Sequence, residues 1–194
     1  TMSLPSLFIP NTGNVRVLCS NYDTHKIHDA VLKEMSELYV ERNCPKKFSI
    51  KQFSANAFYF TVRMYYVTSF ELEKDSQVDV DEVISCIQFL KIKERFLEFL
   101  CNLLVRNASD VSENSFMFLY RHVKFNDRAL LDLLRIRNAA HIQKLVEKTT
   151  EYSELRQILR AISGTGILSC DTFRDNPKIL YVDDGEMSLH HITA

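Results

Sequence analysis

The stretch that decides the fold runs from Phe48 to Asn107 and alternates short polar turns with apolar segments. It reads FSIKQFSANAF at 48–58 and, after an acidic loop, DEVISCIQFLKIKERFLEFLCNLLVRN at 81–107. Phe48–Ile50 is short, apolar and flanked by lysines, which favours a strand near the edge of a sheet. The remainder of the stretch has the spacing of amphipathic helices, so the segment predicts a mixture of strand and helix.

Three local signals define the helices of this stretch. Ser54 is typical of a helix N-cap, and Asp79 followed by Glu82 fits a capping box in which each side chain satisfies a free backbone amide of the other. The charged run 91–95 interrupts the apolar pattern, so we expect two packed helices rather than one long one. The second should end near Asn107.

The preceding segment predicts a hairpin and a further helix. The β-type run 15–19 and the segment 24–28 are separated by the turn formers of 20–23. Asp29 can cap a helix that ends before Pro45, since proline lacks the amide hydrogen that a helix interior needs. The apolar face of this helix comprises Val31, Met35 and Leu38.

The region after residue 107 reads as helical throughout. Apolar residues recur at helical spacing in four groups, and Thr149 with Thr150 could cap the last helix. The groups are Phe116, Leu119, Tyr120 and Val123; Leu130, Leu133 and Leu134; Ile142, Leu145 and Val146; and Leu155, Ile158, Leu159 and Ile162. From Gly164 onward the sequence turns polar and acidic, which predicts a loosely attached tail.

These patterns together predict an α+β fold, in which a small sheet flanked by helices is followed by an all-helical extension. We expect an N-terminal arm at 1–13, a mixed α and β domain at 14–107, a helical region at 108–163 and a polar acidic tail at 164–194.

Composition restricts the partners and the compartment. The chain has 194 residues, 46% of them hydrophobic, and a net charge of −1, so it can bury a core but has no global field for nucleic acid or an anionic membrane. Five cysteines without a Cys-x-x-Cys pattern suit a reducing compartment. No apolar run approaches the ~20 residues that span a bilayer. We therefore expect the cytoplasm or the nucleus, and no membrane partner.

Motifs for chemistry are missing from the sequence. There is no phosphate-cradling glycine loop, no nucleophile elbow and no pair of carboxylates in an apolar setting, so we predict no enzyme activity, catalytic residue or cofactor. His25 and His28 would point to opposite faces of a strand, and no further ligands complete a metal site. The basic residues of 121–160 read as solvated helix faces, and we predict no nucleic-acid partner.

Four segments, taken in order, resemble a known family of interaction domains. IKQFSANAF at 50–58 is similar to the Leu-x-x-Val-Ser-x-x-Ala-Phe of BTB/POZ domains, and YVTSF at 66–70 resembles their Tyr-Thr-Gly-x-Leu turn. IQFLKIKE at 87–94 resembles the helix pair of that family, and SFMFLYRHVKF at 115–125 resembles the opening of a BACK-type helical extension.

The resemblance implies a protein-interaction adaptor that homodimerises and that binds cullin-3 to present a substrate protein for ubiquitination. It implies partner-binding residues around the start of the helix near residue 81, in the preceding turn and in the extension, namely Phe70, Val78, Asp79, Val80, Asp81, Glu82 and Tyr120. The alternative is a scaffold that has no ligase role and that self-associates or assembles a nuclear or cytoplasmic complex through its helical half and tail.

Overall fold

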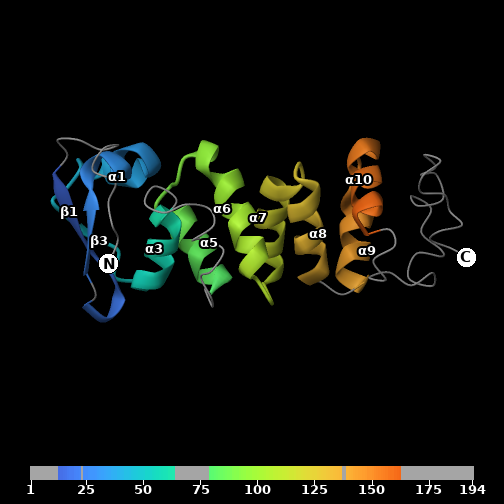
Figure 1. Ribbon diagram of the computed structural model, residues 1–194, viewed down its shortest axis with the longest axis horizontal. Helices are drawn as coiled ribbons and strands as arrows, with labels where there is room; N and C mark the ends of the chain where they lie inside the picture. Colours follow the sequence, from blue (N-terminus) through green and yellow to red (C-terminus); the bar gives the residue numbers. More distant parts are fainter. Residues whose placement is uncertain (1–12, 23, 64–78, 137–138, 163–194) are drawn as a thin grey trace, which may run out of the picture. The chain divides into compact units, whose positions relative to one another are not determined.

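A computed structural model describes residues 13–22, 24–63, 79–136 and 139–162 of the chain (Figure 1). The expected arm, apart from residue 13, and the expected tail from 164 onward lie outside the described residues. The chain divides into two compact units, residues 1–118 and 119–194, and the division falls within helix α7 (Glu113–Val123). The sequence pattern predicts a division earlier, after residue 107.

The first unit contains a three-stranded mixed sheet, so the α+β class is confirmed. Strands β1 (Asn14–Leu18) and β2 (Thr24–His28) form the predicted antiparallel hairpin, and β3 (Lys47–Ser49) pairs parallel with β1. The order is β2-β1-β3, which confirms that β3 lies at an edge. The hairpin turn, η1 (Ser20–Tyr22), has positive φ at its last two residues, which matches the twist of paired strands.

One face of this sheet builds the core. Val15 and Val17 of β1 are buried, as are their cross-strand partners Ile27 and Phe48. His25 lies on the same face, where its ring is 6.4 Å from that of Phe58, while residue 28 points to the opposite face, as predicted from strand periodicity. The other face of the sheet is therefore left for polar side chains.

The helix predicted from Asp29 differs from the structure in two ways. It is split into α1 (Asp29–Met35) and α2 (Glu37–Glu41), and Asp29 is the first helical residue rather than the cap. The Asp29 carboxylate instead accepts a hydrogen bond from the hydroxyl of Tyr39, at 2.5 Å. Because of the break, Tyr39 is fully buried in the place predicted for Leu38, which is half-buried.

The break between α1 and α2 has a long-range cause. Ser36 forms a β-bridge with Ile92, its hydroxyl donates to the Leu90 carbonyl at 2.6 Å, and the same oxygen accepts from the Tyr39 amide at 3.2 Å. Next to these contacts, the amide of Lys93 donates a hydrogen bond to the Met35 carbonyl. The chain at Ser36 therefore leaves the helix to pair with a turn more than fifty residues away in sequence.

That turn is the charged interruption predicted between the two helices. Helix α5 (Val80–Phe89) ends and α6 (Glu94–Asn107) begins as expected, and α6 stops at the predicted residue. Lys91 adopts a left-handed φ of 51°, and the Ile92 amide donates to the Ile87 carbonyl, as in a Schellman C-cap. Helix α3 (Ala55–Val62) begins at the predicted cap Ser54 and packs on α5.

The cysteines of the described chain are all free, as the sequence suggests. Cys19, Cys86 and Cys101 are buried and Cys44 is half-buried. Burial raises the pKa of Cys86 and of Cys101 to about 12. These thiols therefore act as small apolar groups of the core.

The second unit is helical wherever it is described. It contains the end of α7 and the helices α8 (Asp127–Ile136), α9 (Ala139–Lys148) and α10 (Tyr152–Ile162), and α8 packs on α10. The prediction that Thr149 caps the last helix is wrong. Its hydroxyl donates to the Leu145 carbonyl at 2.7 Å and so closes α9, whereas α10 begins later.

Candidate interaction surfaces

The start of α5 gathers most of the predicted partner-binding residues. Asp79, Val80, Asp81 and Glu82 follow one another there, while Phe70 and Val78 lie outside the described residues. Asp79 is exposed and caps the helix by accepting a hydrogen bond from the Glu82 amide at 3.2 Å. A carboxylate at this position also interacts favourably with the helix dipole. The capping prediction for Asp79 is thus confirmed.

The second half of the predicted capping box is wrong. The Glu82 carboxylate accepts a hydrogen bond from the amide of Ser54, at 2.7 Å, rather than from the amide of Asp79. Ser54 is the N-cap of α3, so this contact links the first turn of α5 to the start of α3. The reciprocal bond of a capping box has been replaced by a tie between two helices.

The two remaining residues of this group also have internal roles. Val80 is buried, with 4% of its surface exposed. Asp81 is exposed, and its carboxylate accepts hydrogen bonds from Ser112 through the hydroxyl at 3.0 Å and the amide at 3.3 Å. Because the hydroxyl of Ser112 also accepts from the Ser115 amide, Asp81 supports the start of α7. Each described acid of this group therefore already has a partner within the first unit.

Tyr120 lies in the second unit and is also buried. It is 5% exposed, and its hydroxyl donates to the Glu154 carboxylate at 2.6 Å. Burial and the adjacent carboxylate raise the pKa of Tyr120 above its ordinary value. Lys124 approaches the same carboxylate at 3.4 Å. These contacts fasten the end of α7 to the start of α10.

Two exposed aromatic residues flank that junction, and the sequence patterns did not identify them. We call Phe125 and Tyr152 the aromatic pair; they are 76% and 48% exposed. Phe125 is next to Lys124 in sequence, and the Lys124 ammonium lies 5.2 Å from its ring. The guanidinium of Arg156 lies 5.8 Å from the ring of Tyr152. In the sequence, Phe125 follows the apolar stripe of α7 rather than belonging to it, and this position was a signal that its side chain is exposed.

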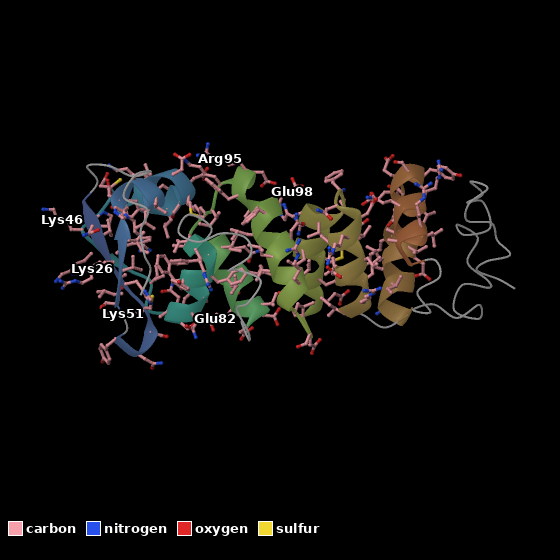
Figure 2. All side chains as sticks on the ribbon, in the orientation of Figure 1. Lys26, Lys46, Lys51, Glu82, Arg95 and Glu98 are labelled. Atoms are coloured by element: carbon pink, nitrogen blue, oxygen red, sulfur yellow. The ribbon has the colours of Figure 1, made fainter. Side chains whose placement is uncertain are left out.

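The outer face of the sheet carries a basic surface. A hollow of about 310 Å³ is lined by Asn14, Arg16, Lys26, Lys46 and Lys47, and we call it the basic hollow. Figure 2 shows Lys26 and Lys46 pointing away from the helices of the first unit. The lysines beside β3 were recognised in the sequence as edge residues. Their association with Arg16 and Lys26 depends on the pairing of β3 with β1, which the sequence pattern did not predict.

Among the described residues, no group of three or more His, Cys, Asp or Glu side chains could hold a metal ion. No helix in the same part of the chain is long and apolar enough to cross a membrane. Comparison with family models, with curated proteins and with solved structures found no match to this chain.

Proposed function

We propose that the protein is a protein-interaction adaptor and that the aromatic pair of the second unit is part of its binding surface. The observation that carries the proposal is the exposure of Phe125, at 76%, and of Tyr152, at 48%, within two residues in sequence of Lys124 and Glu154, which pair with each other. Single exposed apolar residues are common and carry no such meaning. Two exposed aromatic rings, with cations 5.2 and 5.8 Å from their centres, match the composition of interface hot spots.

The junction beneath the aromatic pair supports this proposal because it is preorganised. Two contacts to Glu154 hold the end of α7 and the start of α10 together, namely a short hydrogen bond from the Tyr120 hydroxyl and an ion pair with Lys124. A surface that is already ordered loses little entropy when a partner binds. The four free cysteines of the described chain favour a reducing compartment, and we propose the cytoplasm or the nucleus.

Matched substitutions in the two units test the role of the aromatic pair. Tyr152 and Val40 are both 48% exposed, and Val40 lies in the first unit. We expect the full chain to self-associate in sedimentation velocity, and Phe125→Ser and Tyr152→Ser to weaken this about tenfold or more. Val40→Ser should not change it. Equal effects of Val40→Ser and Tyr152→Ser would remove the aromatic pair from the proposal.

Cullin-3 recruitment is the ligase form of the adaptor role, and it is implied by the resemblance to BTB/POZ domains. A specific observation favours the scaffold form instead. Val80 is buried, and the carboxylates of Asp81 and Glu82 accept hydrogen bonds within the first unit. Family members that bind cullin-3 carry an apolar residue, any residue and then an acid near the start of this helix, in the register Val80-Asp81-Glu82 or Val78-Asp79-Val80. In the first register the apolar side chain must be accessible, and Val80 is not; Val78 lies outside the described residues.

Mixing the full chain with the purified N-terminal region of cullin-3 separates the two forms. A dissociation constant on the order of tens of micromolar or tighter, measured by calorimetry, would support the ligase form. Absence of binding in that range, with self-association retained, would assign the protein to the scaffold form. If the chain neither binds cullin-3 nor self-associates, the adaptor proposal is contradicted for both cullin-3 and a second copy of the chain.

A further inference from the structure

The register of the sheet places three cations side by side across all three strands. Arg16 of the central strand is paired with Lys26 on one side and with Lys47 on the other. Directly opposed residues point to the same face of a sheet, and neighbouring strands are about 4.8 Å apart. The three charges therefore form a row about 10 Å wide, to which Lys46 adds a fourth charge at the rim of the basic hollow.

This row is electrostatically unfavourable in the free protein. Like charges directly opposite one another destabilise a sheet. None of these four cationic side chains forms an ion pair with an acid in the described part of the chain, and no acid lines the basic hollow. Other cations of the same unit are compensated by an acid, as in the pairs Lys33 with Asp29, Lys91 with Glu41 and Arg95 with Glu34.

Protection of sheet edges explains only part of the row. Lysines on edge strands prevent pairing with other chains, and this accounts for Lys26 on β2 and Lys47 on β3. Arg16 lies on the central strand, where there is no edge to protect. Asn14, which also lines the hollow, adds an amide that can donate hydrogen bonds. The arrangement thus brings together donors and positive charge without a compensating acid from the described ranges 13–22, 24–63, 79–136 and 139–162.

We propose that the basic hollow binds a compact polyanion that carries several linked phosphate groups. Its volume of about 310 Å³ is at the small end of the range for small-molecule sites. The guanidinium of Arg16 has the fork geometry that suits phosphate oxygens, and the lysines supply charge on both sides of it. Bound phosphates would relieve the repulsion across the row.

The composition of the lining favours such a ligand over a nucleic acid or an acidic peptide. The residues that line the hollow include no aromatic side chain on which a base could stack. They also include no apolar side chain that could receive the non-polar part of a peptide. A ligand whose surface consists mainly of anionic oxygens fits the five lining residues best.

Calorimetry on the full chain at fixed ionic strength tests the proposal, with inorganic tripolyphosphate, orthophosphate and a tri-glutamate peptide as probes. Tripolyphosphate should bind at least tenfold more tightly than either of the others, because only it presents several phosphates within the width of the row. Equal affinity for tripolyphosphate and orthophosphate, or tighter binding of the peptide, would overturn the proposal.

Substitutions that remove one charge identify the site. Lys26→Gln and Lys47→Gln should each weaken tripolyphosphate binding about tenfold, whereas Lys51→Gln is the control, since Lys51 is an exposed lysine outside the hollow (Figure 2). Equal losses in Lys26→Gln and Lys51→Gln would reduce the effect to general charge and refute the site. Thermal unfolding at low salt without ligand checks folding: Lys26→Gln should be at least as stable as the wild type, because one opposed charge is gone.

Discussion

Glu82 decides between a structural and a recruiting role for the acids at the start of α5, and its substitution gives a sharp prediction. Its carboxylate accepts a hydrogen bond from the Ser54 amide at 2.7 Å, and this bond joins α5 to α3 through two residues that are 28 positions apart in the sequence. Glu82→Ala removes the acceptor and the charge. Glu82→Gln keeps an acceptor but removes the charge. If the contact stabilises the fold, both variants should lose stability, alanine more than glutamine.

The size of the loss follows from the contact and its exposure. A hydrogen bond to a charged group contributes about 1.5–3 kcal/mol, and the half-buried setting of Glu82 places it in the lower part of this range. The charge in the first turn of α5 adds about 0.3–1 kcal/mol through the helix dipole. We expect Glu82→Ala to cost about 2 kcal/mol and Glu82→Gln about 1 kcal/mol. At this chain length each kcal/mol lowers the melting temperature by about 2–4 °C.

Thermal and urea unfolding of the full chain at neutral pH provide the measurement. Glu98→Gln is the matched control, because Glu98 is an exposed acid of α6 in the same unit and the change in net charge is identical (Figure 2). A loss for Glu82→Ala no greater than that of Glu98→Gln would refute the structural role. The Glu82 carboxylate would then be available to a partner, and the burial of Val80 would be the remaining argument against recruitment through these residues.

Three further predictions concern buried polar groups. Ser36→Ala should cost about 2–3 kcal/mol in urea unfolding, because a fully buried hydroxyl that both donates and accepts is lost; a loss below about 1 kcal/mol would contradict its role in the helix break. The pKa of Tyr120 is raised above its ordinary value of 10.0. Its protonated hydroxyl therefore stabilises the fold fully below pH 10.0, and this contribution is lost as the pH rises further. Wild-type stability should therefore fall more steeply above pH 10.0 than that of Tyr120→Phe, and parallel curves would contradict this. With pKa values raised to about 12 by burial, Cys86 and Cys101 should be alkylated at pH 8 more slowly than half-buried Cys44; peptide mapping that finds equal rates would refute their burial.

Much of the fold could be predicted because its signals are local. Ser54 caps α3 by accepting a hydrogen bond from the amide of Ala57, three residues later, and Asp79 caps α5 in the same way through Glu82. The charged run 91–95 ends one helix and begins the next within a few residues. In each case the residues that make the contact are close in sequence, so composition and spacing were sufficient.

The errors occur where a distant segment competes with a local preference. The spacing of Met35 and Leu38 predicts one helix, but pairing of Ser36 with Ile92 breaks it and buries Tyr39 instead. Glu82 fits a capping box, but Ser54 offers an amide from another helix. Sequence periodicity contains no information about which distant backbone group lies within reach.

The two proposed surfaces were missed for a related reason, and the same reason makes them independently testable. The basic hollow arises from strand register in the first unit, and the aromatic pair from a helix junction in the second. Since no lining residue of one surface belongs to the other, Lys26→Gln should reduce polyanion binding without changing self-association. Phe125→Ser should have the converse effect. A variant that altered both polyanion binding and self-association would reveal coupling between the two units. Each interaction would then have to be measured with the other one present.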